Sequence, residues 1–205
     1  MPTRRERDAL QMKDDILAAA SQIAEQEGFE AISVRKIAQK IDYTPSLIYH
    51  YFASKEEIIS VLLQRGYQKL TIALGTSMHA AKEPIAMLTG MTRTFLMTAL
   101  TIPKEFVIVH LDSSAEVLEH TSYLSKGDME KRLPLQFIGK CINAMHEGRV
   151  LDQDLVELTA QSIAAATLGL ALKLITEKDL PLKQRETVIT YFSDIVVARM
   201  ARMEE

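Results

Sequence analysis

The most constraining feature of this sequence is a pair of short helical patterns separated by a break of about three residues. Apolar residues within 34–41 recur at positions i, i+3, i+4 and i+7, which is the spacing of one helix face. Ser33 precedes this segment as a candidate N-cap, and Thr44 followed by Pro45 is a typical start for a second helix over 45–52. The segment therefore predicts a helix-turn-helix unit.

Helix-forming residues also dominate the rest of the sequence, and no long stretch alternates as a strand does. The eight Gly and six Pro are too few for a fold built mainly from tight turns. Residues 106–109 have strand propensity, but no partner strand is visible elsewhere, so a helix is favoured there. Further helices are predicted over 8–28, from a capping box at 54–57 toward residue 80, over 85–100 and from 103 to about 112. A later helix ends at 148, and the last two cover 152–176 and 181–203. The sequence therefore predicts an all-α fold.

Composition favours a cytoplasmic protein. The single cysteine, Cys141, cannot form an internal disulfide, so no oxidising compartment is implied. The basic N-terminus has no apolar run behind it, unlike a signal peptide. The most apolar stretch, 163–175, contains Lys173 and is shorter than the roughly 20 residues that span a bilayer. We therefore expect no membrane partner.

Charge is distributed unevenly along the first quarter of the chain. The whole chain carries a net charge of −3, which gives no argument for nucleic-acid binding. Residues 1–7, however, carry a net +2 and residues 31–55 a net +3, whereas the segment 8–30 is acidic. A basic arm and a basic cluster thus flank an acidic helix, although scattered surface charge explains the same pattern equally well.

The helix-turn-helix segment carries a more specific pattern. Residues 28–41 read GFEAISVRKIAQKI, and residues 46–59 read SLIYHYFASKEEII. Together they resemble the DNA-binding domain of the tetracycline-repressor (TetR) family over about residues 10–60, and 147–154 resembles the C-terminal half of that family more weakly. Asp42 stands where the family usually has Gly. The resemblance implies a DNA-binding domain over 1–53 and a helical ligand-binding and dimerisation domain over 54–205.

The resemblance also implies which side chains contact DNA. The small residues at the start of the second short helix would face base edges in the major groove, and the rings, hydroxyls and cations around it would contact phosphates. The implied contacts are Ser33, Arg35, Lys36, Thr44, Pro45, Ser46, Leu47, Tyr49, His50, Tyr51 and Lys55. Successive helix residues lie about 100° apart, so Tyr49 and Tyr51 cannot both face outward with His50. One of the two tyrosines is therefore expected to be partly core.

The middle of the chain is rich in methionines and aromatic residues. Such side chains fill irregular space adaptably, which suits a pocket for a flexible apolar ligand, although ordinary core packing explains each single Met as well. The candidate pocket residues are Met78, Met87, Met91, Phe95, Phe106, His110, Tyr123, Phe137, Cys141 and Met145. The histidines and Cys141 lack metal-ligand spacing, so neither a metal nor another cofactor is expected.

The last two predicted helices carry more apolar residues than one buried face needs. We predict that they pair with their twofold mates in a four-helix bundle. The candidate dimer contacts are Leu155, Leu158, Ile163, Leu168, Leu172, Val188, Phe192, Ile195 and Val196.

Taken together, these features predict a homodimeric transcriptional repressor that binds a palindromic operator in double-stranded DNA and is released by a small, apolar effector. A helical adaptor that binds protein without DNA and a metal-responsive repressor are the alternatives. An all-helical hydrolase or transferase would need a nucleophile–base pair or paired carboxylates, and no such constellation stands out, so we expect no enzyme.

Overall fold

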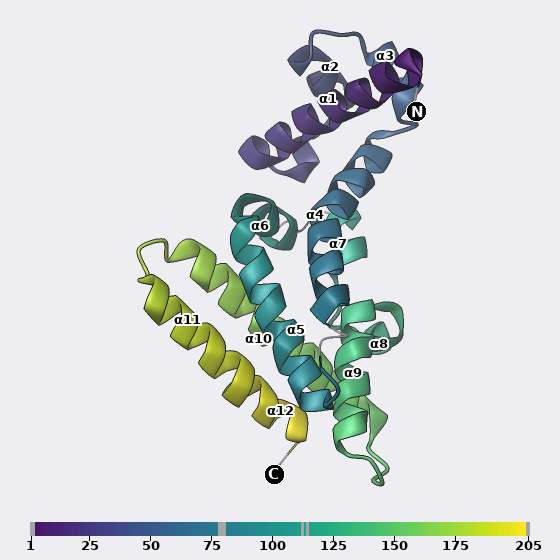
Figure 1. The fold of residues 1–205 in the computed structure, drawn as a ribbon. Helices are drawn as coiled ribbons and strands as arrows, with labels where there is room; N and C mark the ends of the chain where they lie inside the picture. Colours follow the sequence, from purple (N-terminus) through teal and green to yellow (C-terminus); the bar gives the residue numbers. More distant parts are fainter. Residues whose placement is uncertain (1–2, 78–80, 112, 114, 204–205) are drawn as a thin grey trace. The chain divides into compact units, whose positions relative to one another are not determined.

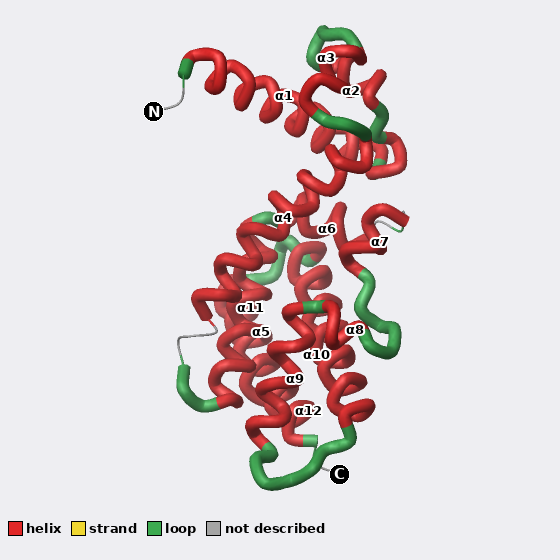
Figure 2. Tube along the Cα trace, turned by 90° about the vertical axis from the view of Figure 1, so that its right-hand side faces the viewer, coloured by secondary structure: helices red, strands yellow, loops and turns green. Residues whose placement is uncertain are grey.

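The computed structural model describes residues 3–77, 81–111, 113 and 115–203, and this part of the chain is helical and contains no strand (Figure 1). Loops of varied length join the helices (Figure 2). The α-helices are α1 (Arg4–Glu27), α2 (Val34–Lys40), α3 (Pro45–Tyr51), α4 (Lys55–Ser77), α5 (Pro84–Thr101), α6 (Pro103–Leu111), α7 (Ala115–Thr121), α8 (Asp128–Lys131), α9 (Leu133–Met145), α10 (Gln153–Thr176), α11 (Leu182–Tyr191) and α12 (Ala198–Arg202). A 3-10 turn, η1 (Phe29–Ala31), precedes α2, and a π-helical segment, η2 (Phe192–Val197), joins α11 to α12. The predicted all-α class is confirmed, including the helix over 106–109.

The chain forms two compact units. The first comprises the described residues up to Gln68 together with Lys104–Thr121, and the second comprises Lys69–Pro103 and the described residues from Ser122 onward. The domain boundary expected between residues 53 and 54 coincides with the beginning of α4, whereas the first compact unit runs further and also takes in α6 and α7.

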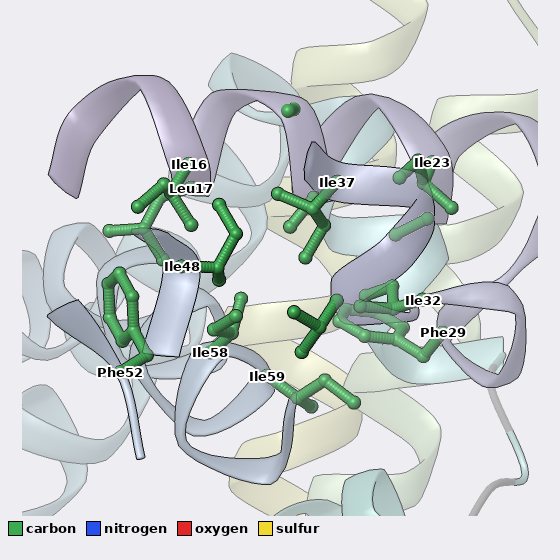
Figure 3. Close-up of a cluster of buried hydrophobic side chains, with 14 of the residues drawn as sticks. Ile16, Leu17, Ile23, Phe29, Ile32, Ile37, Ile48, Phe52, Ile58 and Ile59 are labelled. Atoms are coloured by element: carbon green, nitrogen blue, oxygen red, sulfur yellow. The ribbon is translucent and has the colours of Figure 1, made fainter. Parts of the chain in front are cut away.

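The first unit is built around one apolar core under the helix-turn-helix. Ile37 of α2 and Ile48 of α3 are fully buried and meet Ile16 of α1 and Ile58 of α4 (Figure 3). Ala38, at the crossing of α2 and α3, is also buried, because only a small side chain lets two helices approach closely there. Two valines from α6 and α7, Val109 and Val117, belong to the same buried cluster. The core under the DNA-binding motif therefore includes a segment far away in sequence.

The second unit is a helical bundle in which α5, α9 and α10 pack on one another and on η2 and α12. Its buried cluster includes Leu88 of α5, Ile142 of α9, Val156 of α10 and Val197 of η2. Among the described residues, α10 alone is long and apolar enough to cross a membrane, with a mean hydropathy of 1.5 in its apolar window. It is longer than the apolar stretch expected from the sequence, and core helices of ordinary globular proteins meet the same criteria, so this finding does not identify a membrane span.

Helix ends follow the predicted capping signals with two differences. Thr44 is the N-cap of α3, but its side chain makes no capping hydrogen bond. Ser54 Oγ accepts a hydrogen bond from Glu57 N–H at 3.2 Å, as in a capping box. The Glu57 carboxylate, however, accepts from the N–H of Ala53 at 2.6 Å, one residue earlier than the box predicts. Residues 113–116 read SSAE, which is also a capping-box pattern, but Ser114 lies outside the described residues.

Candidate DNA-binding surface

The turn between α2 and α3 is formed by local chemistry. Ser33 caps α2, since its Oγ accepts a hydrogen bond from the N–H of Lys36 at 3.2 Å. Asp42 adopts the left-handed region with φ of 59°, so it takes the conformation that glycine usually provides at such a turn. The N–H of Tyr43 then donates to the carbonyl of Ala38 at 2.9 Å, which closes the turn. The backbone therefore reaches α3 without a glycine.

Helix α3 presents a polar face and buries the opposite one. Ile48 is fully buried, Leu47 is half-buried, and Tyr49 is 57% exposed. The remaining exposed residues of this face are Thr44, Pro45, Ser46 and His50. Most of the predicted base and phosphate contacts on α3 are thus accessible on one short helix.

The two tyrosines of α3 lie in different environments. Tyr49 is exposed, whereas Tyr51 is half-buried and packs against the core of the first unit. The ring of His50 meets that of Tyr51 edge-on, with 5.2 Å between centroids. The expectation that one tyrosine is partly core is confirmed, and the residue is Tyr51.

Two of the predicted contacts on α2 have partners within the chain. Ser33 is half-buried and occupied as the N-cap, and the Lys36 ammonium lies 2.7 Å from the Glu27 carboxylate of α1. Such an exposed ion pair contributes only about 0–1 kcal/mol, so a phosphate could compete for the lysine. Arg35 is exposed beside them, and Lys55, at the start of α4, is half-buried.

The basic N-terminal arm is helical. Thr3 and Glu6 form a capping box in which the Glu6 carboxylate accepts from the backbone N–H of Thr3 at 2.6 Å. That hydrogen bond lowers the pKa of Glu6. Helix α1 therefore begins at Arg4, and about two helical turns carrying Arg4, Arg5 and Arg7 precede Met12, which packs against the core.

One exposed residue of this surface was not among the predicted contacts. Tyr43 is 52% exposed and directly precedes the N-cap Thr44. The sequence pattern assigned it only to the turn. An aromatic residue in a helix-turn-helix turn, where the partner helices leave little room for a large ring, was the signal that could have indicated it.

The predicted ligand-pocket residues fall into both compact units. Six of them, from α5, α9 and the loop before α8, belong to or pack against the buried cluster of the second unit: Met87, Met91, Tyr123, Phe137, Cys141 and Met145. Phe106 and His110 lie in the first unit, with their rings stacked at 4.1 Å between centroids. Phe95 is half-buried on α5, and Met78 lies outside the described residues.

Burial shifts the titration of three of these residues. Desolvation raises the pKa of Tyr123. Desolvation lowers the pKa of His110, whose Nδ1 lies 2.9 Å from the carbonyl oxygen of Phe106. Desolvation raises the pKa of the Cys141 thiol to about 11, so this cysteine is a buried, unreactive thiol at neutral pH. Among the described residues, no three His, Cys, Asp or Glu side chains are grouped as a metal site would require.

A surface hollow of about 320 Å³ lies on α8 and α9. It is lined by Met129, Glu130, Gln136, Gly139, Lys140 and Asn143. None of the ten predicted pocket residues lines it.

The predicted dimer contacts on α10 and the C-terminal helix differ in accessibility. Leu155, Leu158 and Ile195 are exposed, with Leu158 at 58%. Leu168, Leu172, Val188, Phe192 and Val196 are half-buried. Ile163 is only 1% exposed and belongs to the core of its own unit, so the structure places it away from any surface that a second copy could reach. Tyr191, which was not predicted, is exposed on the same C-terminal helix.

Comparison with known proteins identifies the class of the helix-turn-helix domain. Residues 16–62 match the family of bacterial regulatory proteins, tetR family. The predicted resemblance of the helix-turn-helix segment to this family is therefore confirmed. No curated protein matches the chain.

Solved structures extend the similarity to the whole fold. A TetR-like transcriptional regulator from Rhodococcus sp. RHA1 is 18% identical, with a TM-score of 0.65 over 94% of this chain and 96% of that one. The fatty acid degradation regulator FadR from Bacillus halodurans is 17% identical, with a TM-score of 0.64 over 93% and 95%. The ketosteroid transcriptional regulator KstR2 of Mycobacterium tuberculosis is 21% identical, with a TM-score of 0.63 over 92% and 93%. The chain therefore has the fold of a TetR-family, DNA-binding transcriptional regulator.

Proposed function

We propose that this protein is a homodimeric transcriptional repressor that binds a palindromic operator and is released by a small, apolar effector. The observation that carries the proposal is the exposed polar face of α3, on which Thr44, Ser46, Tyr49 and His50 stand free of the core that holds Ile48. A short helix anchored on one side and polar on the other fits the major groove of DNA.

The exposed apolar residues of α10 and the C-terminal helix support a dimer. Leu155 and Leu158 lie three residues apart on α10, and Tyr191 and Ile195 lie four apart across the end of α11 and η2. Each pair occupies one helix face, and all four side chains are exposed in the single chain. Burial of such faces between two copies would set the spacing of two α3 helices and hence of two operator half-sites.

The composition of the second unit supports an apolar effector. Its cluster contains Met91 and Phe137, with Met87 and Met145 packed against it, and thioethers adapt to ligands of irregular shape. FadR and KstR2, which share the fold, are named for fatty acid degradation and ketosteroids. A coupling of about 1–3 kcal/mol between effector and operator would change DNA affinity about 5–150-fold. The protein would act in the cytoplasm as a regulator without enzymatic activity.

Selection of genomic DNA fragments on the purified full chain, followed by sequencing, tests this function. The recovered site is then titrated at two salt concentrations. We expect an imperfect palindrome whose affinity falls steeply with salt, because phosphate contacts release counterions. Tyr49→Ala and Lys55→Ala weaken binding, while Lys178→Ala, an exposed lysine of the second unit, serves as the matched control. Weak, sequence-independent binding would contradict the proposal and favour the helical adaptor.

A further inference from the structure

The loop over 122–127 returns the chain from the first unit to the second. The chain passes between the two units three times, inside α4, at the beginning of α6 and at the end of α7. The third passage leads directly into this loop, drawn in green between α7 and α8 in Figure 2. The loop therefore connects α7 of the first unit covalently to the second unit.

Glu157 of α10 is the centre of a set of contacts with this loop. Its carboxylate accepts hydrogen bonds from the backbone N–H of Gly127 at 3.1 Å and of Met129 at 2.9 Å. The residue is only 8% exposed, although it carries a charge. The hydrogen bonds from Met129 and Gly127 lower the pKa of this carboxyl, so it is ionised at neutral pH. A buried carboxylate with two backbone donors is a strong and specific attachment.

Two neighbours of Glu157 on α10 reinforce the attachment. Gln161, four residues further along, donates from Nε2 to the carbonyl of Ser125 at 3.0 Å. Asp154, three residues earlier, pairs with Lys126 at 2.5 Å. The N–H of Ser125 donates in turn to the buried carboxylate of Asp128 at 2.9 Å. We call Asp154, Glu157 and Gln161, with the loop that they hold, the loop latch.

Met129 connects the loop latch to the interior of the second unit. Its N–H is one of the two donors to Glu157, and its side chain packs against the buried cluster. A Cβ at Gly139 would lie 2.7 Å from the sulfur of Met129, so this thioether lies directly on the backbone of α9. The same side chain borders the 320 Å³ hollow. A molecule that displaces the thioether would therefore pull on a hydrogen bond of the latch.

We propose that the loop latch is a conformational switch, with Glu157 as its positioning residue, whose opening loosens residues 104–121 of the first unit. The loop continues into α7, and Val117 of α7 and Val109 of α6 belong to the core beneath the helix-turn-helix. Release of the loop removes the fixed end of this segment, and the core under α3 then loses part of its support. The claim that the switch transmits the effector signal rests on the proposed function. The claim that Glu157 holds the loop and thereby residues 104–121 in place does not.

Hydrogen exchange of the full chain, followed by mass spectrometry, tests the latch without DNA or effector. Glu157→Gln keeps the size of the side chain but replaces one acceptor oxygen with a donor. We expect about tenfold faster exchange in residues 125–131 and at least about threefold faster exchange in 104–121. Exchange in α5, which belongs to the second unit, should remain unchanged. The matched control is Glu147→Gln, an exposed glutamate in the turn before α10.

Two outcomes would overturn the proposal. One is unchanged exchange in 125–131, and the other is faster exchange there while 104–121 keeps its wild-type rate. If Glu157→Gln does not fold, Gln161→Ala is measured in its place, because it removes only the hydrogen bond to Ser125. It should loosen the same two segments by a smaller factor.

A DNA titration separates the latch from the proposed function. On the operator recovered by selection, Glu157→Gln should bind about 3–10-fold more weakly than the wild type, and Glu147→Gln should bind equally well. Equal affinity of Glu157→Gln and wild type would contradict a role of the latch in regulation. If the wild type itself selects no operator, the proposed function fails, while the exchange experiment still decides whether the latch exists.

Discussion

The helix-turn-helix and the loop latch show two ways in which this chain holds a loop in place. The turn between α2 and α3 is fixed by neighbours in sequence, namely the Ser33 cap, the left-handed Asp42 and the bond from Tyr43 to Ala38. The loop over 122–127 is instead fixed by α10, with Glu157 about 30 residues away in sequence. The turn of the helix-turn-helix is thus encoded locally, whereas the position of the loop over 122–127 depends on long-range contacts. Four experiments could break or sharpen this difference.

The largest effect is expected from the core that supports α3. Ile48→Ala removes a fully buried side chain and should destabilise the first unit by about 2–5 kcal/mol. Thermal denaturation monitored by circular dichroism measures the loss, and operator binding should disappear with it. Ser46→Ala, on the exposed face of the same helix, is the control and should leave the melting temperature unchanged. An equal melting temperature for Ile48→Ala would contradict the packing described for α3.

The second effect concerns the proposed dimer. Leu158→Glu places a charge on the exposed face of α10 and should raise the dimer dissociation constant by at least about 100-fold, because a buried unpaired charge is costly. Analytical ultracentrifugation measures the change. Leu133→Glu, at a leucine of α9 that is still more exposed and lies outside the proposed interface, should leave the dimer intact. Dissociation by both variants, or by neither, would argue against this interface.

The third effect is a pH dependence of the latch. Because hydrogen bonds from Met129 and Gly127 lower the pKa of Glu157, its ionised form stabilises the fold above the ordinary value of 4.5. This contribution is lost as pH falls through the lowered pKa. The neighbouring carboxylates Asp128 and Asp154 oppose the shift. At pH 7, Glu157→Gln should melt about 2–8 °C below the wild type.

The difference in melting temperature between Glu157→Gln and wild type should shrink as the pH falls below 4.5 and vanish below the lowered pKa. Differential scanning calorimetry between pH 3 and pH 7 would follow it. A difference that stays constant over this range would show that the carboxylate charge has no part in the latch.

The smallest effect is expected at the turn itself. Asp42→Gly removes the cost of a left-handed residue with a Cβ and should stabilise the protein by at most about 1 kcal/mol. Asp42→Ala should instead destabilise it by about 1 kcal/mol, because Ala lacks the local hydrogen bonding of Asp. Chemical denaturation measures whether each variant raises or lowers the free energy of unfolding. The opposite order of the two variants would mean that Asp42 makes a contact beyond its backbone conformation.

The sequence predicted the DNA-binding unit well because its signals are local. The Ser33 cap, Pro45 at the first turn of α3 and the buried spacing from Ile37 to Ile48 all lie within about twenty residues. Helix geometry predicted that one of Tyr49 and Tyr51 is partly core, and only the structure shows that this residue is Tyr51. The sequence pattern assigned Tyr43 only to the turn, and its exposure is seen only in the structure.

The second unit was predicted less completely for the same physical reason. The helical periodicity identified α9 and α10, but it could not show that Ile163 faces the core of its own chain or that Phe106 packs in the other unit. Glu157 lies on a mostly apolar helix, and only the three-dimensional structure shows its two backbone donors. Long-range polar contacts of this kind leave no periodic pattern in the sequence.

The most direct test of the central claim compares two α3 variants on single-base-pair variants of the recovered operator. Ser46→Ala removes an exposed hydroxyl that is proposed to face a base edge, and Tyr49→Phe removes one that is proposed to contact a phosphate. The account predicts that Ser46→Ala relaxes discrimination at one position of each half-site, while Tyr49→Phe weakens binding to all variants by the same factor. Wild-type affinity for both variants across the whole series would contradict the claim that α3 reads the operator.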